Sequence, residues 1–280
     1  MTAAIQAPPA GTATSVSIQN VTKRYQRSGK TIQALAETSL DFSPGKFISL
    51  IGPSGCGKST LLKIMAGLET ATSGRVLFDG VPVTGPRDGT SVAFQKPTLL
   101  PWRNVMDNLL LPLQLTGAKI DSSVHDHARQ LLTLMGLEDF AGHFPRELSG
   151  GMEQRAAIAR SLISKPRLLL MDEPFGALDE FTREDLNDEL LSLWANEPKT
   201  LIFVTHSISE AVFLSDQIVV MKARPGAVHD VIDVPLARPR YRDIRSSPEF
   251  YDIIRKVRLS LEEAKSGRVP TEIGRRNGSA

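Results

Sequence analysis

Residues 52–60 read GPSGCGKST, and no other stretch restricts the possible folds of this chain as strongly. The outer two glycines enclose four residues, and Lys58 and Ser59 follow directly, which is the pattern of a phosphate-binding loop. An apolar run at residues 46–51 precedes the loop, and residues 59–66 have the apolar spacing of a helix. The sequence therefore predicts a buried strand, a glycine-rich turn and then a helix.

The start of the predicted helix suits a bound phosphate for a physical reason. Its first backbone N–H groups have no partner within the helix, and the helix dipole is positive there. A nucleoside triphosphate supplies the acceptors, so we expect ATP or GTP, with Lys58 at the β- and γ-phosphates and Ser59 on Mg²⁺. The rest of the loop would cradle the phosphates: Gly52, Pro53, Ser54, Gly55, Cys56, Gly57 and Thr60. An ordinary glycine-rich turn is the alternative.

Composition narrows the class of protein. With 280 residues, 41% of them hydrophobic, the chain can bury a large core, and its net charge of +2 gives no overall field that would attract nucleic acid. No apolar run approaches the length of a membrane span, and residues 1–15 lack the features of a signal peptide. Cys56 is the single cysteine, so no disulfide can form within one chain.

Three segments follow from these patterns. We expect a flexible arm at residues 1–15, a main domain at residues 16–235 and a C-terminal extension at residues 236–280. We expect the extension to be a solvated tail. The alternative is a role in regulation or lipid contact through three basic residues, Arg268, Arg275 and Arg276.

An alternation of strands and helices indicates an α/β fold. Three runs are continuously apolar, as in strands buried on both faces of a parallel sheet: 167–171, 200–204 and 217–221. Predicted helices at residues 179–195 and 208–214 alternate with them. Residues 16–47 predict short strands, and a change of pattern at residues 97–150 predicts a helical insert. A weaker signal predicts a strand at 228–234 and a helix at 248–263.

Two carboxylates, Asp172 and Glu173, follow one of the apolar runs, at the edge where an α/β sheet presents its ligands. We expect Asp172 to hold Mg²⁺ through water and Glu173 to act as general base on the attacking water. A pair of acids that cap the next helix is the alternative.

Further polar residues follow other strands. His206 comes after the run at 200–204, so it can contact the γ-phosphate. Gln95 ends a strand before the insert and can offer its amide oxygen to Mg²⁺ or to the attacking water. The remaining histidines lie in polar text, and we expect them at the surface: His125, His127, His143 and His229.

Ser149, Gly150 and Gly151 open a second helix that suits an anion. One chain needs only one γ-phosphate site, so this second start indicates that it serves the nucleotide of a neighbouring chain. An ordinary capped helix is the alternative.

Taken together, these motifs resemble the ATP-binding cassette family, and in particular the ATPase subunit of an ABC importer. The resemblance covers residues 16–221, and the motifs come in the family's order. Tyr25 resembles the aromatic residue that stacks on adenine, residues 52–60 resemble the Walker A loop, and Gln95 resembles the glutamine of the Q-loop. Residues 148–155 then resemble the signature, Asp172 and Glu173 resemble Walker B, residues 177–179 resemble the D-loop, and His206 resembles the switch histidine. Two departures are Met152, where the signature usually has Gln, and Gly176, where Ser is frequent.

The resemblance implies a P-loop NTPase core of ABC type with an antiparallel β subdomain and a helical insert. It also implies a head-to-tail dimer in which ATP and Mg²⁺ lie between two chains. Lys58, Gln95, Glu173 and His206 would be catalytic, and Ser59, Gln95 and Asp172 would hold the metal. Ser149, Gly150 and Gly151 of the second copy would complete the site.

Residues 97–105 and 172–179 resemble importers of nitrate, taurine and aliphatic sulfonates, which implies uptake of a small anionic solute through separate transmembrane permease subunits. A solute-binding protein would take part indirectly, and the chain would lie peripherally on the cytoplasmic face of the cell membrane. Trp102, Leu99 and Leu100 are candidate contacts to the permease, with simple packing of the insert as the alternative.

Two other functions are compatible with a phosphate-binding loop. A soluble ABC-type ATPase acting on nucleic acid or ribosomes usually has two cassettes or a long coiled coil, and Gln95 and Leu148 lie too close in sequence for the latter. A small-molecule phosphotransferase would need an acceptor pocket. The helix start at Ser149, Gly150 and Gly151, together with His206, argues against a phosphotransferase.

Overall fold

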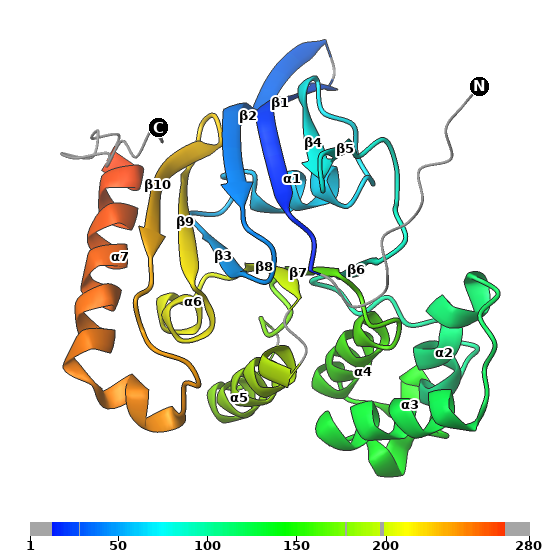
Figure 1. Cartoon of the computed structure of the whole chain (residues 1–280). Coiled ribbons are helices and arrows are strands. Elements are labelled where there is room, and N and C mark those ends of the chain that lie inside the picture. Colours follow the sequence, from blue (N-terminus) through cyan, green and yellow to red (C-terminus); the bar gives the residue numbers. More distant parts are fainter. Residues whose placement is uncertain (1–12, 28, 177, 197–198, 267–280) are drawn as a thin grey trace.

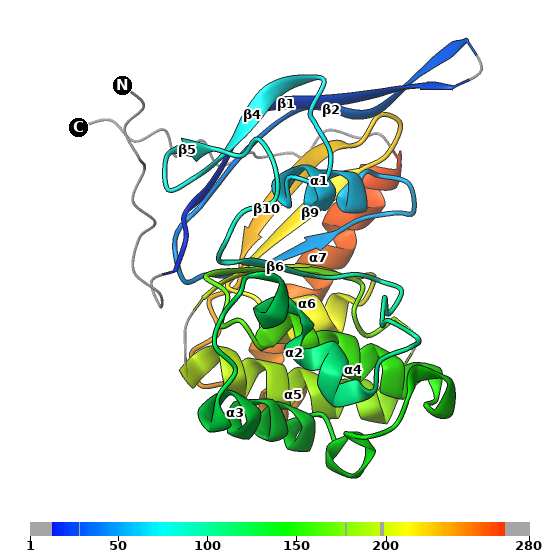
Figure 2. The same cartoon turned by 90° about the vertical axis from the view of Figure 1, so that its right-hand side faces the viewer.

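The computed structural model describes residues 13–27, 29–176, 178–196 and 199–266. Figure 2 shows three layers: a small sheet with α1 (Lys58–Met65) beneath it, a large sheet in the middle, and most of the helices below. Figure 1 shows the same layers from the side, with the helical insert at the lower right. The α/β class and the three parts expected of an ABC-type core are confirmed.

The smaller sheet is antiparallel and has the strand order β2-β1-β4-β5. Its strands are β1 (Val16–Arg27), β2 (Lys30–Phe42), β4 (Ser73–Phe78) and β5 (Val81–Pro82). The prediction of short strands is wrong for β1 and β2, which form a long hairpin. Register shifts between Ile18 and Arg24 break the period-two alternation, so the sequence pattern looks interrupted where the hairpin continues.

The larger sheet has the strand order β10-β9-β3-β8-β7-β6. Its strands are β3 (Phe47–Ile51), β6 (Thr90–Ala93), β7 (Leu168–Asp172), β8 (Thr200–Val204), β9 (Gln217–Lys222) and β10 (Ala227–Asp233). All neighbours are parallel except β10, which pairs antiparallel with β9. Every residue of β3, β7 and β8 is buried, as continuously apolar strands predict.

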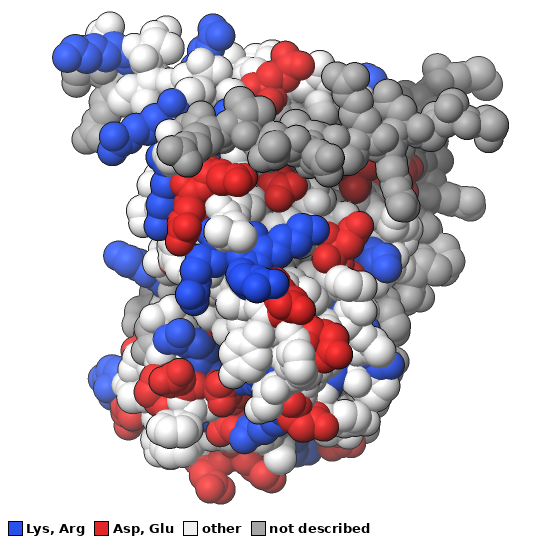
Figure 3. Space-filling view, turned by 90° about the vertical axis from the view of Figure 1, so that its left-hand side faces the viewer, with Lys and Arg blue, Asp and Glu red and all other residues white. Residues whose placement is uncertain are grey.

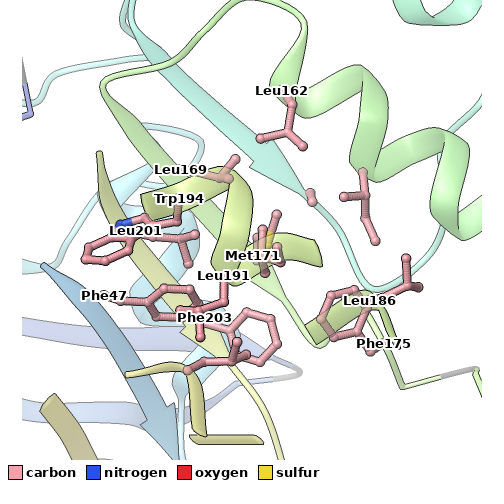
Figure 4. Close-up of a cluster of buried hydrophobic side chains, with 14 of the residues drawn as sticks. Phe47, Leu162, Leu169, Met171, Phe175, Leu186, Leu191, Trp194, Leu201 and Phe203 are labelled. Carbon is pink, nitrogen blue, oxygen red and sulfur yellow. The ribbon is translucent and has the colours of Figure 1, made fainter. Parts of the chain in front are cut away.

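Each face of the large sheet has its own apolar core. On one face, Leu61, Leu62 and Met65 of α1 pack between the two sheets. On the other, Phe47 packs against Trp194 and Phe203, with ring centroids 6.1 and 6.0 Å apart. Figure 4 shows these aromatic side chains among leucines from strands and helices. The sheet is therefore covered on both sides, which holds its strand ends in fixed positions.

The α-helices that follow α1 are α2 (Val105–Leu115), α3 (Ser122–Leu134), α4 (Gly150–Leu162), α5 (Glu180–Asn196), α6 (Ile208–Leu214) and α7 (Pro248–Ser266). Three short 3₁₀ turns are η1 (Glu138–Phe140), η2 (Pro145–Glu147) and η3 (Arg242–Ser246). The expected insert contains two helices, α2 and α3. The apolar spacing of residues 124–135 predicts α3, whereas no such spacing predicts α2. Pro112 lies inside α2, where it interrupts the apolar run and removes one backbone hydrogen-bond donor.

The C-terminal extension is not a solvated tail as far as Ser266. Phe250, Val257 and Ala264 of α7 are buried, and the helix packs on β9, β10 and α6. His229 on β10 is only 8% exposed, so its expected surface position is also wrong. The apolar face of α7 covers β10, the strand that carries His229. Arg268, Arg275 and Arg276 lie outside the described residues, as does most of the expected arm at residues 1–15.

The outer face of α7 carries charges of both signs. Figure 3 shows basic and acidic side chains in adjacent bands on this side of the molecule. Arg255, for example, lies 3.0 Å from Asp252. The described residues of this face therefore carry charges of both signs and not a field of one sign that would attract an anionic surface. Within the described residues, no helix has the length and apolar character needed to cross a membrane.

Candidate active site

The predicted site residues come together at one edge of the large sheet. Strands β3, β6, β7 and β8 run parallel, so their carboxyl ends share that edge. The loop at residues 52–57 follows β3, Gln95 follows β6, Asp172 and Glu173 stand at the end of β7, and His206 follows β8. Four separate parts of the sequence thus meet where the loop enters α1.

Glycine is required at two points of the loop because neighbouring chain segments press against it. A Cβ at Gly52 would lie 2.5 Å from the carbonyl oxygen of Met221, and one at Gly57 would lie 2.4 Å from Leu35 Cδ2. Gly57 also has a φ of 91° and precedes α1, whose start has no side-chain cap. The first N–H groups of α1 are therefore left for a ligand.

The other residues of the loop differ in exposure. Ser54 and Gly55 are exposed, Pro53 is half-buried, and Gly52 and Cys56 are buried. Burial raises the pKa of the Cys56 thiol, so this side chain is neutral packing beneath the loop. The exposed side of the loop is the side that a phosphate can reach.

Lys58 folds over this loop. The residue is 5% exposed, and its Nζ donates to the Gly52 carbonyl at 2.9 Å and lies 3.5 Å from the Pro53 carbonyl. A buried ammonium beside open N–H groups gives the loop strong attraction for an anion.

Ser59 and Asp172 form the second part of the site. Ser59 Oγ donates to Asp172 Oδ1 at 2.9 Å, and Asp172 is 6% exposed. Burial raises the pKa of Asp172, with Glu173 adding to the rise and the Ser59 hydrogen bond opposing it. A divalent cation would offset the cost of this buried carboxylate, so the two oxygen donors fit Mg²⁺.

Few protein ligands are available for a metal here. The described part of the chain has no group of three or more His, Cys, Asp and Glu side chains that could hold an ion. Mg²⁺ at phosphate sites commonly takes one or two protein oxygens and completes its shell with phosphate and water. The pair of Ser59 and Asp172 is sufficient for a site of that kind.

Glu173 lies between two residues that come from other strands. Gln95 Nε2 donates to Glu173 Oε2 at 3.1 Å, and His206 Nε2 lies 2.6 Å from Glu173 Oε1. The backbone of Glu173 is left-handed, with φ of 49°, and its N–H donates to the Val204 carbonyl. The carboxylate borders a pocket of about 480 Å³, where it is placed to accept a proton from water.

Tyr25 stands beside the first turn of α1. Burial and the Glu69 side chain raise the pKa of its phenol, which is also in contact with Thr60. Lys23 Nζ lies 4.9 Å from the centre of the Tyr25 ring. The ring is thus held at the end of the phosphate loop, where a base attached to a bound triphosphate could reach it.

The residues Ser149, Gly150 and Gly151 lie elsewhere. They open α4, with Ser149 Oγ accepting from Met152 N at 3.3 Å. A Cβ at Gly151 would lie 3.0 Å from Leu178 Cδ2, so this helix start borders the segment after β7. Helix α4 belongs to the core on the opposite face of the sheet from α1. One chain therefore does not bring the two helix starts together.

Some residues near the site had no sequence signal. Arg183 and Glu210 also line the pocket in front of Glu173, and Gln154 is buried with its amide donating to the Phe94 carbonyl next to Gln95. Gln154 lies within the predicted signature, but the sequence assigns it no role there. No motif marks Arg183 or Glu210, because their positions depend on a contact between distant segments. Ala177, within the predicted D-loop, lies outside the described residues.

Comparisons with known proteins agree on one family. Residues 35–176 match the family model described as ABC transporter. The aliphatic sulfonates import ATP-binding protein SsuB of Bacillus cereus is 42% identical, over 92% of this chain and 100% of that protein. The taurine import ATP-binding protein TauB of Rhizobium johnstonii is 44% identical, over 85% and 93%.

Solved structures are similar as well. One is a dimeric ATP-binding cassette in a post-hydrolysis state bound to ADP and Pi, with 33% sequence identity and a TM-score of 0.72. It covers 79% of this chain, and all of that structure is matched.

Proposed function

The chain belongs to the ABC transporter family as an ATP-binding cassette and an ATPase, and on this basis we propose that it powers an importer of a small anionic solute. The sulfonate and taurine import proteins, each matched over more than nine-tenths of its length, support import. Nitrate has weaker support, because it rests on the sequence resemblance alone. The relatives thus support the solute class and the direction of transport, and the geometry of the site supports hydrolysis.

The observation that carries hydrolysis is the carboxylate of Glu173, which Gln95 and His206 hold at the carboxyl edge of the sheet. Glu173 takes the proton of the attacking water, and His206 holds the carboxylate and contacts the γ-phosphate. Lys58 and the open N–H groups of α1 bind the phosphates and stabilise the charge that develops on them. The site lies beside α1, so water and phosphate meet at one place.

The proposed sites for the metal ion and for the adenine ring of ATP follow from the same geometry. Ser59 and Asp172 would hold Mg²⁺, with Gln95 as a third oxygen donor, and the ion would neutralise charge on the β- and γ-phosphates. Tyr25 would stack on the adenine.

A second copy of the chain would complete the site. Ser149, Gly150 and Gly151 expose a helix start that suits an anion, yet α4 lies across the sheet from α1. In a head-to-tail dimer, this helix start would face the γ-phosphate bound by the other copy. The similar cassette structure is dimeric, which supports this arrangement. Closure would exclude water from the nucleotide, and hydrolysis would let the copies separate.

The helical insert would face transmembrane permease subunits. Trp102 is 71% exposed and Leu115 is 78% exposed, so both apolar side chains of the insert are open to a partner. Leu99 packs against the core instead, which fits the alternative of simple packing for that residue. We place the chain peripherally on the cytoplasmic face of the membrane, where a solute-binding protein acts on it only through the permease.

The test is to purify the complex from its native membrane, identify the solute-binding protein that accompanies it, and measure ATP hydrolysis with candidate solutes. We expect permease subunits in the complex and stimulation by taurine, an alkanesulfonate or nitrate. Phosphate and sulfate, which are small oxyanions of higher charge, are the controls. Hydrolysis that responds to nucleic acid or ribosomes, with no permease present, would overturn the importer assignment.

A further inference from the structure

A group of polar residues behind His206 has no role in the mechanism above. Glu210 on α6 is 6% exposed, and its carboxylate accepts a hydrogen bond from Thr205 Oγ1. Arg183 Nε on α5 lies 3.7 Å from Glu210 Oε1. Burial raises the pKa of Glu210, and Thr205 and Arg183 oppose that rise. A carboxylate so deeply buried needs these partners to remain charged, so its position depends on them.

This carboxylate fixes the segment that carries His206. Thr205 Oγ1 accepts a hydrogen bond from the backbone N–H of Ser207 at 3.0 Å, and Ser207 Oγ accepts from Glu210 N at 3.3 Å. His206 therefore lies between two residues that are both tied to Glu210. Its own side chain is 48% exposed, so packing does little to hold the ring against Glu173.

Arg183 extends the chain of contacts in the other direction. Its Nη2 donates to the Leu178 carbonyl at 2.9 Å. The Leu178 side chain in turn borders Gly151 at the start of α4. One guanidinium thus joins the segment beside the Ser149 helix start to the segment that carries His206. One end of this connection lies beside the helix start at Ser149, which is proposed to serve the nucleotide of the other copy. The other end lies at His206, which is proposed to serve the nucleotide of its own copy.

We propose that Arg183 is a positioning residue that couples the Leu178 segment to His206 through Glu210 and Thr205. The inference rests on the proposed dimer. When the second copy approaches the Leu178 segment, the connection would transmit this approach to His206. In this proposal Arg183 makes no direct contact with the nucleotide or the metal. It sets how often His206 holds the Glu173 carboxylate in the orientation that hydrolysis requires.

The experiment compares steady-state ATP hydrolysis by the full-length chain and its variants. We expect Arg183→Ala to lower kcat by about tenfold or more, with KM for ATP within about twofold of wild type. Arg183→Lys keeps the charge but not both contacts, so we expect it to recover part of kcat. A purely structural role would instead lower the amount of active protein and leave kcat per active site unchanged, which titration of ATP-binding sites separates.

The pH profile provides a second readout. The charged groups that face Glu210 are Arg183 from α5 and Arg245 from η3. Without Arg183, the pKa of Glu210 rises further, because less positive charge opposes the effect of burial. We therefore expect the acid limb of kcat to move to higher pH in Arg183→Ala.

Arg242→Ala is the matched control. Arg242 is an arginine that forms ion pairs with Asp185 and Asp188 of α5, and it has no contact with Glu210 in the described structure. We expect wild-type kcat, KM and pH profile from it. If Arg183→Ala loses no more kcat than Arg242→Ala, or loses activity only through a raised KM, the proposal is wrong.

Two further results complete the test. If Arg183→Ala fails to fold, Thr205→Val removes the same connection with little change of shape, and it must show the same loss of kcat. Normal kcat in a folded Thr205→Val variant would overturn the proposal. A wild-type chain without any ATP hydrolysis would contradict the proposed function instead, so the two failures are distinguishable.

Discussion

His206 Nε2 lies 2.6 Å from Glu173 Oε1, although the two residues follow different strands. Gln95, from a third strand, donates to the other oxygen of the same carboxylate. The parallel sheet makes this convergence possible, because the ends of β6, β7 and β8 lie side by side. The carboxylate is oriented by both neighbours before any ligand arrives, which is the preorganisation that general-base chemistry needs.

Glu173→Gln should abolish turnover while leaving nucleotide binding intact. The amide keeps the size of the side chain but cannot accept a proton, so we expect kcat to fall by about 10² to 10⁴ and ATP affinity to change little. Single-turnover hydrolysis and equilibrium binding of ATP measure the two quantities. Glu180→Gln, an exposed acid at the start of α5, is the control. Normal turnover in Glu173→Gln would remove Glu173 as the base.

Lys58→Ala should act on binding itself. Its ammonium is buried among the loop carbonyls, so its loss removes the positive charge closest to the phosphates. We expect the Kd for ATP to rise by about tenfold or more, measured by calorimetry. Lys63→Ala, on the exposed face of the same helix, should bind ATP within about twofold of wild type. Unchanged affinity in Lys58→Ala would contradict the loop assignment.

Arg240 should be critical for stability. It is 5% exposed, and its guanidinium donates to carbonyls at the end of α6 and in the following chain, among them those of Phe213, Ser215 and Leu236. Burial lowers its pKa to about 10, so it remains charged at neutral pH. Arg240→Ala leaves these carbonyls without partners, and we expect a loss of about 2 to 4 kcal/mol in the free energy of unfolding.

Denaturant titration measures that loss. Arg255→Ala, which removes an exposed ion pair with Asp252, should cost less than about 1 kcal/mol. Equal losses in the two variants would show that the Arg240 hydrogen bonds add nothing to ordinary arginine packing.

Asp79 should give stability a dependence on acid pH. Burial alone raises the pKa of this carboxyl, but the backbone N–H of Ser15 and the Arg167 guanidinium outweigh burial and hold it below its ordinary value. The charged form thus stabilises the fold above the unfolded-state pKa, and this contribution is lost as pH falls through the lower folded-state pKa. We expect Asp79→Asn to be less stable by about 1 kcal/mol at neutral pH.

The difference between Asp79→Asn and wild type should shrink below about pH 4, where the unfolded aspartate takes up its proton. Denaturant midpoints between neutral and strongly acid pH measure it. A difference that is constant across this range would assign the effect to lost packing instead of lost charge.

The sequence predicts the core of this fold well because the core obeys local rules. A strand buried on both faces must be apolar throughout, so β7, β8 and β9 are visible as runs of apolar residues. The loop at residues 52–57 is visible because close neighbours exclude side chains at Gly52 and Gly57. Strand ends carry the other site residues, and the rule that parallel strands present ligands at one edge then places them together.

Other features escape prediction because they depend on contacts between distant segments. Nothing near His229 in sequence shows that α7 will cover it. The length of the β1–β2 hairpin is hidden by its bulges, and α2 by Pro112. The pair of Arg183 and Glu210 forms only when α5 and α6 pack side by side, and neither residue belongs to a motif.

The central claim is that two copies of this chain complete each nucleotide site. Sedimentation of Glu173→Gln with ATP and Mg²⁺ tests it most directly, because that variant should hold ATP without hydrolysing it. We predict a dimer with ATP and a monomer with ADP, and we predict that adding Ser149→Arg at the exposed start of α4 prevents the dimer while ATP still binds. A chain that stays monomeric with saturating ATP, or a dimer that Ser149→Arg leaves intact, would contradict the account.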